Sequence, residues 1–330
     1  MEEEKIIIEQ KIKEEEEIKN IFLMNPNKIN IKNKEILNNL YSLTNIGHKK
    51  ENQDISFCIK SKNNFDCVMG ILDGHGIFGK MISHTVHDFF IKKISDFLNE
   101  LKFFDDLKKN IHILTENFLK KCFDQIENDI CNGNLKKNSE LSGTTCSLLI
   151  KLKDYLYIAS VGDSRIVLGF IDDNKIKSKR LTIDHRFNIK KEFDMVSKAG
   201  GVICSKNNKS NTLRVWLSKE KLKELNIKYN TPGLMVSRSI GDSIAKIAGC
   251  SSEPDILSLK IKSEYKFIIM ASDGLWDVLT DDEAVELINN FKNENLSAKE
   301  ATTNLMNFVM LKSKNDDLFL DNITISVMYL

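Results

Sequence analysis

Four short acidic motifs contain the residues of this sequence best suited to chemistry. They are Asp73-Gly74, Asp163 in a Gly-Asp-Ser-Arg stretch, Asp273-Gly274 and Asp321-Asn322, each of which lies beside an apolar run. An aspartate at the end of a buried strand is held rigidly, and carboxylate oxygens are the ligands that hard divalent cations prefer. One such aspartate says little, because an isolated Asp-Gly pair is usually a β-turn. The repetition of the pattern predicts a carboxylate cage for divalent cations.

The glycines around the first motif offer a competing interpretation. Gly74, Gly76 and Gly79 match the spacing of a dinucleotide-binding loop. Such a loop needs a second parallel strand after the helix that it opens, with an acidic residue roughly 20 positions further on. Here a second helical stretch follows the first, and Asp96 lies inside the first helical run. We therefore expect no nucleotide at this loop.

The apolar pattern between the motifs predicts the elements that must position them. Strand-like runs occupy residues 55–59, 65–72, 145–150, 155–161, 165–171, 266–271 and 323–329. Short polar turns between some of them, such as 153–154 and 162–164, predict antiparallel hairpins. Asp163 in particular suits a hairpin turn.

Helical signals fall between and after these strands. Apolar residues recur at helical spacing over 82–101 and 114–130. Thr280 with Glu283, and Ser297 with Glu300, match the capping box that begins a helix. Strands and helices that cluster in this way predict an α+β fold, with sheet packed on sheet and helices outside.

Composition narrows the class of protein. The 330 residues are 42% hydrophobic and carry a formal net charge of +1, so we expect a globular chain that does not bind nucleic acid. The 7 cysteines form no Cys-x-x-Cys pair, which predicts reduced thiols and a cytoplasmic or nuclear location. The acidic N-terminus lacks a signal peptide, and no apolar run approaches the ~20 residues of a membrane span. We expect no stable membrane association.

Nine motifs, read together in order, carry a family resemblance. They are GHKKENQD (47–54), DGHG (73–76), SGTT (142–145), GDSR (162–165), DHR (184–186), AGG (199–201), SRSIGD (237–242), ASDGLWD (271–277) and DN (321–322). Over residues 41–330 the chain resembles the metal-dependent, type 2C (PPM) family of serine/threonine protein phosphatases. The resemblance implies a four-layer α/β/β/α sandwich of two antiparallel sheets flanked by helix pairs, with a flap subdomain at about 187–235. Residues 1–40 are expected to form a charged N-terminal extension, either a solvated helix or a disordered arm, with a partner-binding helix as the less favoured alternative.

The resemblance also implies roles for the acidic residues. Asp73 corresponds to the aspartate that bridges two Mg²⁺ or Mn²⁺ ions, and the backbone carbonyl of Gly74 contributes to one of them. Asp273 and Asp321 match the residues that complete one ion. Asp163, together with Asp273, matches the ligands of a weaker third ion. Two such ions about 3.5–4 Å apart share a water, lower its pKa and aim the resulting hydroxide at phosphorus, without a covalent phosphoenzyme.

Several other positions are predicted to bear on catalysis. His75 corresponds to the family's general acid, which protonates the leaving oxygen. Lys49 stands where many relatives have an arginine that grips the substrate phosphate, and lysine lacks the bidentate fork. Gln53 replaces a glutamate that binds metal in some relatives, which leaves Asp54 as the nearby carboxylate for the second ion. For Asp242, a metal contact and a supporting role behind the ligands are both open.

The remaining histidines and the lysines of the flap have simpler interpretations. His185 is expected to be structural, and His48, His84, His87 and His112 have no convergent partners in the sequence. Lys219, Lys221 and Lys223 are predicted either to lie on a solvated helix or to dock the substrate.

The expected activity is metal-dependent hydrolysis of phosphoserine and phosphothreonine in phosphoprotein substrates, by a monomer. The alternatives are an inactive scaffold that keeps the fold and a hydrolase of small phosphate esters.

Overall fold

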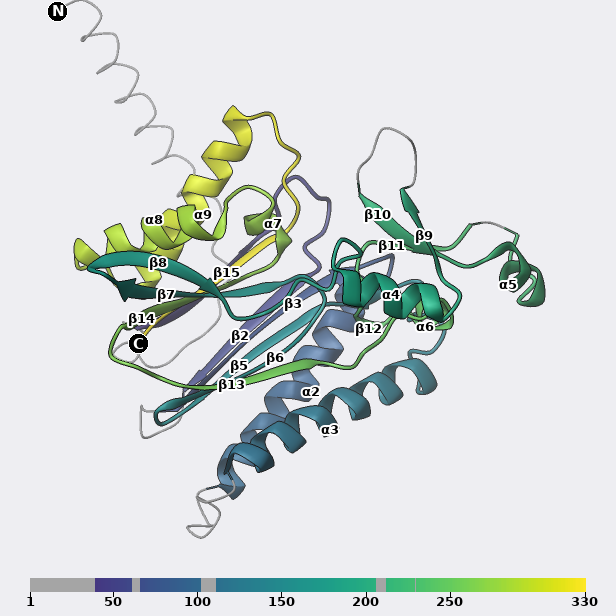
Figure 1. Cartoon of the computed structure of the whole chain (residues 1–330), viewed down its shortest axis with the longest axis horizontal. Helices are drawn as coiled ribbons and strands as arrows, with labels where there is room; N and C mark the ends of the chain where they lie inside the picture. The colour runs from purple at the N-terminus through teal and green to yellow at the C-terminus, as the bar shows by residue number, and fades with distance from the viewer. Residues whose placement is uncertain (1–38, 61–65, 102–110, 206–211, 229) are drawn as a thin grey trace, which may run out of the picture. The chain divides into compact units, whose positions relative to one another are not determined.

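Two β-sheets lie at the centre of the fold in the computed structural model, which describes residues 39–60, 66–101, 111–205, 212–228 and 230–330 (Figure 1). The larger sheet contains β2 (Asp54–Lys60), β3 (Cys67–His75), β4 (Gly143–Thr144), β5 (Cys146–Leu152), β6 (Tyr155–Val161), β12 (Ile240–Gly241) and β13 (Asp255–Lys260). The smaller sheet contains β1 (Leu40–Asn45), β7 (Arg165–Asp172), β8 (Lys175–Arg180), β14 (Tyr265–Ala271) and β15 (Ile323–Tyr329). The strand pairs in both sheets are antiparallel.

Side chains that alternate along the strands separate the core into layers. On β3, Met69 and Ile71 belong to a cluster between the two sheets, while Val68 and Leu72 belong to a cluster that faces helices. This is the two-residue period of a strand that is buried on both faces. Strand β14 repeats the arrangement on the other side, because Ile268 and its neighbours alternate between the sheet–sheet cluster and a second helix-facing cluster.

Helix pairs cover the two outer faces. The larger sheet is covered by α2 (Gly79–Glu100) and α3 (Ile111–Asn132), and the smaller sheet by α8 (Asp281–Asn293) and α9 (Ala298–Asn315) (Figure 1). Both predicted capping boxes are present, at the starts of α8 and α9. The predicted α+β sandwich of helices, two antiparallel sheets and helices is confirmed.

The predicted flap region forms a small sheet of its own. Strands β9 (Val202–Ser205), β10 (Leu213–Trp216) and β11 (Pro232–Leu234) pair in the order β11-β10-β9, with α4 (Lys190–Lys198) and α5 (Lys219–Glu224) beside them in sequence. A separate apolar cluster holds this sheet, and it includes Ala245 and Ala248 from α6 (Ser243–Ile247) and its C-terminal end. The flap core therefore draws on residues beyond 235.

The hairpin predicted at residues 153–154 is present, whereas the prediction of a hairpin at residues 162–164 is wrong. Strands β5 and β6 form a hairpin, whose turn places Lys153 in the left-handed region. Residues 162–164, however, connect β6 in the larger sheet to β7 in the smaller one. The stretch around Asp163 is therefore a crossover between layers, because a strand–turn–strand pattern does not say which sheet the second strand joins.

Two further expectations concern the loop after β3 and the membrane. Strand β3 pairs antiparallel with β5, so the parallel strand–helix–strand unit of a dinucleotide site is not formed there. Within the described ranges, no helix is long and apolar enough to cross a membrane. Nearly all of the predicted N-terminal extension, residues 1–38, lies outside the described residues.

Candidate active site

The four acidic motifs meet at one cleft, which lies between the ends of strands from both sheets and the flap. The cleft has a volume of about 500 Å³. Its lining includes Asp73 from β3, Asp163 from the crossover, Asp273 at the start of α7 (Asp273–Trp276) and Asp321 just before β15. The fold therefore brings these four carboxylates together from distant segments, as the sequence predicts.

Asp73 lies directly across the β2–β3 ladder from Asp54. The Oδ2 atom of Asp54 accepts hydrogen bonds from the hydroxyls of Ser272, at 2.7 Å, and Thr324, at 2.8 Å. Oδ1 is buried and has no hydrogen-bond partner among the described residues. Burial, together with repulsion from Asp321, raises the pKa of Asp54 to about 6. Burial and repulsion from neighbouring carboxylates, Asp54 foremost, raise the pKa of Asp73 well above its usual range.

Asp163 and Asp273 both face the guanidinium of Arg186. The Arg186 Nε lies 2.7 Å from Oδ2 of Asp163, and its Nη2 lies 3.3 Å from Oδ2 of Asp273. Burial and repulsion from Asp163 and Asp277 raise the pKa of Asp273 well above its usual range, although Arg186 opposes the shift. The sequence did not predict this arginine as part of the site.

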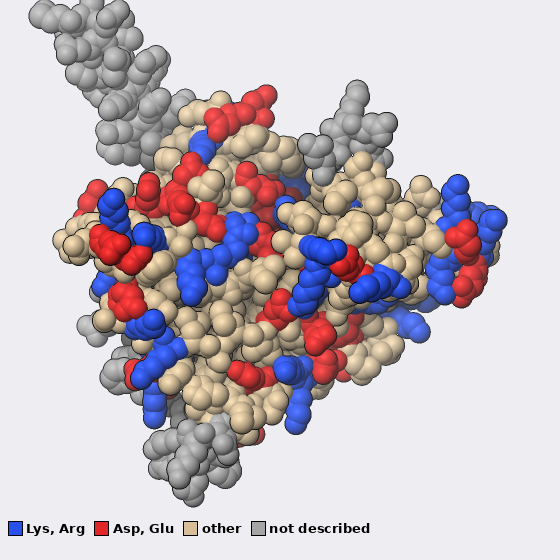
Figure 2. Space-filling model, viewed as in Figure 1, with Lys and Arg blue, Asp and Glu red and all other residues tan. Residues whose placement is uncertain are grey.

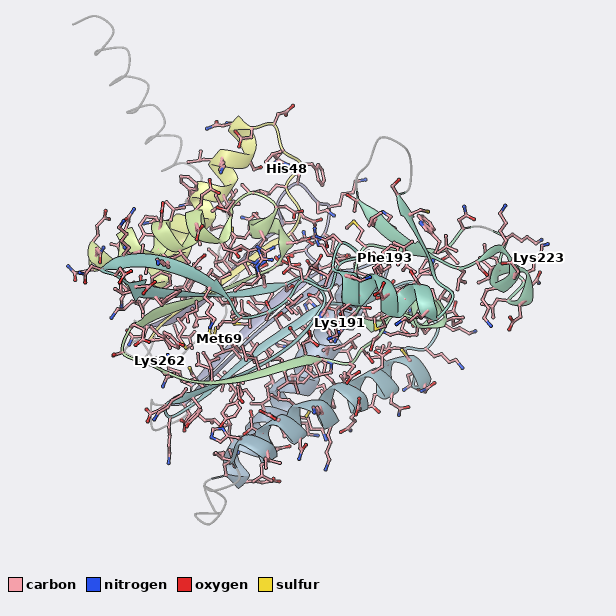
Figure 3. The ribbon with its side chains drawn as sticks, in the orientation of Figure 1. His48, Met69, Lys191, Phe193, Lys223 and Lys262 are labelled. Atoms are coloured by element: carbon pink, nitrogen blue, oxygen red, sulfur yellow. The ribbon has the colours of Figure 1, made fainter. Side chains whose placement is uncertain are left out.

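Asp321 pairs with the lysine that was predicted to bind phosphate. The Lys49 Nζ lies 2.8 Å from Oδ2 of Asp321, and the backbone N–H of Asn322 donates to Oδ1 at 2.7 Å. The Asn322 side chain accepts from the backbone N–H of Gln53 at 2.9 Å. These contacts join the loop before β15 to the loop before β2. His48, labelled in Figure 3, belongs to the loop before β2, and its Nδ1 accepts a hydrogen bond from the backbone N–H of Leu320 at 3.1 Å.

His75 lies at the end of β3 and contacts Asp242, which comes from a segment 167 residues away. The His75 Nε2 lies 2.6 Å from Oδ2 of Asp242, and Ser239 donates its hydroxyl to the same oxygen. Burial alone would lower the pKa of His75, but the charge and hydrogen bond of Asp242 raise it overall. Of the two roles left open for Asp242, the geometry favours support of His75.

The glycines of the first motif are needed for close packing. A Cβ on Gly74 would lie 2.6 Å from the carbonyl oxygen of Gly79 and 2.8 Å from that of Gln53. The start of α2 therefore packs directly on the backbone of β3. The amide of Gln53 donates from Nε2 to the carbonyl of Gly76 at 2.9 Å, so this side chain braces the loop.

The predicted structural histidine is buried between two segments. The Nδ1 of His185 accepts from the backbone N–H of Gly162 at 3.0 Å, and its Nε2 lies 3.2 Å from Oδ2 of Asp255. It thus ties the crossover to β13, as expected for a structural residue.

The flap contributes one cation that sequence reasoning missed. Arg214 on β10 lines the cleft, and its Nη1 donates to the carbonyl of Gly233 at 2.6 Å. It is the one arginine of the five in the sequence that has no carboxylate partner among the described residues. Its only sequence signal is a position in the flap before the apolar Val215-Trp216 pair.

The lysines proposed as a docking surface lie elsewhere. Residues 219, 221 and 223 belong to α5, which has no buried residue and does not line the cleft. Lys223 lies at the far end of the flap in Figure 3. Figure 2 shows acidic and basic side chains mixed across the rest of this face. The solvated-helix interpretation is the one that this placement favours.

The carboxylates fit divalent cations, although no finished cage is present. Among the described residues, no three acidic, histidine or cysteine side chains are arranged to hold one ion together. Asp163 and Asp273 turn toward Arg186, and Asp321 turns toward Lys49. Asp73, Asp54 and Asp273 nonetheless crowd negative charge into a buried region, and Oδ1 of Asp54 lacks a donor. A cation would relieve both conditions, since carboxylates are its preferred ligands.

Comparisons with known sequences identify the family of this chain. Residues 47–318 match the family model of protein phosphatase 2C. A probable protein phosphatase 2C 72 from Arabidopsis thaliana is 32% identical over 73% of this chain and 70% of its own length. A probable protein phosphatase 2C 65 from the same plant is 28% identical over 70% of this chain, which spans 60% of that relative's length.

Solved structures share the fold. A serine-threonine phosphatase 2C from Toxoplasma gondii superposes with a TM-score of 0.76 at 21% identity, covering 88% of this chain and 94% of its own. A sex determining protein of C. elegans superposes with a TM-score of 0.65 at 16% identity, and the superposition covers 94% of this chain and 70% of that protein's chain. At these identities the likeness concerns the fold alone. The family match over residues 47–318 and the Arabidopsis relative at 32% identity show that the chain belongs to the protein phosphatase 2C family.

Proposed function

We propose that this chain is a metal-dependent protein phosphatase that hydrolyses phosphoserine and phosphothreonine in proteins. The observation that carries the proposal is the convergence of Asp73, Asp273 and Asp321 on one cleft beside His75. An open cleft of this kind admits a side chain presented by another protein, which supports phosphoproteins as the substrates. The monomeric state and the cytoplasmic or nuclear location remain predictions from the sequence.

The acidic residues would hold two divalent cations, either Mg²⁺ or Mn²⁺. Asp73 and Gly74 line the same cleft as Asp273 and Asp321, and both of these carboxylates repel that of Asp73. When bound, such ions lower the pKa of a water molecule and neutralise charge on the phosphoryl group. Asp54, fixed by Ser272 and Thr324, would strengthen the negative field behind Asp73 or contribute its unpaired Oδ1 to the second ion.

His75 would donate a proton to the leaving oxygen of the serine or threonine. The Asp242 carboxylate favours the protonated ring, as the raised pKa of His75 indicates. Because Asp242 engages Nε2, the Nδ1 atom is left without a hydrogen bond among the described residues. That nitrogen is the one available to meet a substrate.

Two cations at the cleft would bind the substrate. Lys49 reaches the cleft from the loop before β2 and can hold a phosphate oxygen as a point charge. Arg214 approaches from the flap, and a single hydrogen bond leaves most of its five N–H donors for an incoming oxyanion. The arginine fork that Lys49 lacks would thus come from the flap.

Phosphate release from a phosphothreonine peptide tests the proposal. The chain is assayed with Mn²⁺, with EDTA and as the Asp73→Ala variant, beside a small aryl phosphate as a second substrate. We expect release from the peptide with Mn²⁺ only, and its loss in the variant. Folding of the variant is checked by its thermal melting.

Each alternative predicts a different outcome. Absence of metal-dependent release from either substrate would favour the inactive scaffold. Release from the aryl phosphate but never from phosphopeptides would favour a hydrolase of small esters.

A further inference from the structure

The guanidinium of Arg186 occupies the centre of a group of three carboxylates. Besides its contacts with Asp163 at 2.7 Å and Asp273 at 3.3 Å, its Nη2 lies 3.7 Å from Oδ1 of Asp277. Asp163 and Asp273 are the residues that the family resemblance assigns to a third, weaker divalent ion. One fixed cation and the expected third ion therefore compete for the same oxygens.

The backbone holds Arg186 in this place. The residue forms an isolated β-bridge with Val236, and its N–H donates to the carbonyl of Asp184 at 2.8 Å. Its neighbours in sequence, His185 and Phe187, are both buried. The side chain is only 33% exposed. The anchored segment therefore places the guanidinium within reach of all three carboxylates.

The type of residue matters as much as its position. Burial alone would lower the pKa of Arg186, but Asp163, Asp273 and Asp277 raise it overall. Arginine stays charged at any pH that keeps a protein folded, whereas lysine can lose its proton when buried. A divalent cation must therefore displace the whole side chain rather than a proton. Only five of the 48 basic residues are arginine, and one of the five stands here.

The contact leaves the other ions unhindered. Asp273 contacts Arg186 through Oδ2, and no hydrogen bond among the described residues occupies its Oδ1. Asp73 and Asp321 make no contact with Arg186. Arg186 therefore occupies no oxygen of Asp73 or Asp321 and only one oxygen of Asp273.

We propose that Arg186 holds the position between Asp163, Asp273 and Asp277 against a third divalent cation, so that this chain works with two ions. The inference rests on the proposed metal-dependent function and specifies its ion count. Two charge-assisted hydrogen bonds, each worth about a tenfold change in an equilibrium constant or more, oppose entry of a third ion.

Counting bound Mn²⁺ by calorimetry and by electron paramagnetic resonance tests the inference. The wild-type chain is expected to take up two ions and no third at millimolar Mn²⁺. Arg186→Met, which keeps the length of the side chain without its charge, is expected to gain a third, weaker ion. Adding Asp163→Asn to that variant should remove the gain. Arg180→Met serves as the matched control, because Arg180 pairs with Asp184 and Asp281 instead.

The outcomes separate the inference from the function on which it rests. Three ions in the wild type, the third lost in Asp163→Asn, would overturn the inference and leave the phosphatase proposal standing. A folded Arg186→Met variant that still binds two ions would overturn it as well. No Mn²⁺ binding at all would overturn both. Where the variant does not fold, a wild-type count of three ions still overturns the inference.

Discussion

A buried ion pair fastens the flap to the catalytic core. Arg238 donates from Nη2 to Oε1 of Glu192 at 2.6 Å and from Nε to Oε2 at 2.9 Å. The Ser237 hydroxyl donates to the same carboxylate at 2.6 Å. The two charged side chains are 5% and 1% exposed. Glu192 lies on α4, whereas Arg238 lies just before β12, so the pair joins the flap region to the larger sheet.

Removing one partner should be far worse than removing both. Arg238→Met leaves the Glu192 carboxylate buried with only Ser237 as a donor, and breaking such a pair costs about 3–5 kcal/mol. That is a large share of the roughly 5–15 kcal/mol that stabilises a folded domain. The double variant Glu192→Leu/Arg238→Met removes both charges. Asp255, which Arg238 also contacts at 3.0 Å, keeps His185 and Lys191 as partners, so we expect the double variant to lose only about 1–2 kcal/mol.

Urea unfolding followed by tryptophan fluorescence measures the difference. The two tryptophans, Trp216 on β10 and Trp276 on α7, report on the flap and on the catalytic core. Lys190→Met is the control, because Lys190 pairs with Asp194 at the surface of the same helix, where an ion pair contributes about 0–1 kcal/mol. An Arg238→Met variant within about 1 kcal/mol of wild type, or a double variant no more stable than it, would refute the reasoning.

The same pair predicts a dependence on pH. Burial would raise the pKa of Glu192, but the hydrogen bonds from Arg238 and Ser237 hold it below its ordinary value of 4.5. A carboxyl whose pKa is lowered by folding adds stability above its ordinary pKa and loses it as the pH falls through the lowered value. The penalty of Arg238→Met should therefore shrink below about pH 4.5, and a penalty that grew on acidification would contradict this sign.

Three further changes give distinct readouts. Asp242→Asn should lower kcat by about ten- to a hundredfold with little change in KM, because His75 loses its carboxylate partner. An unchanged kcat would show that the contact between Asp242 and His75 does not support catalysis. Arg214→Ala should raise KM for a phosphopeptide about tenfold, whereas Lys223→Ala on the solvated helix should leave KM unchanged. Equal changes in KM for the two variants would contradict the role of Arg214 in substrate binding. Thr280→Ala removes the N-cap of α8 and should lower the free energy of unfolding by about 1 kcal/mol; a loss below a few tenths in urea unfolding would count against the capping box.

Local patterns predicted much of the fold because its elements follow simple periods. The apolar run before Asp73 alternates between two cores in β3, and the capping boxes before α8 and α9 form as their sequence indicates. The acidic motifs are evident in the sequence for the same reason, since each follows or precedes an apolar run. Both kinds of signal lie within a few residues of one another in the chain.

The missed features depend on contacts between distant segments. The pattern around Asp163 predicts a hairpin, because nothing local shows that β7 joins the other sheet. Asp242 and His75 are 167 residues apart, and Arg186 meets Asp273 across 87. Side-chain partners at such separations are fixed by the packing of layers, which the order of residue types along the chain does not display.

Activation by Mn²⁺ tests most directly whether the carboxylates around Asp73 do the chemistry. Initial rates of phosphate release from a phosphothreonine peptide are measured across Mn²⁺ concentrations for the wild type, Asp73→Asn and Glu51→Gln. Glu51 is the control, because it lines the same cleft but pairs with Lys80. We predict a loss of about a thousandfold or more and no Mn²⁺ response in Asp73→Asn, and near-normal activation in Glu51→Gln. An Asp73→Asn variant that Mn²⁺ activates like the wild type would contradict the account.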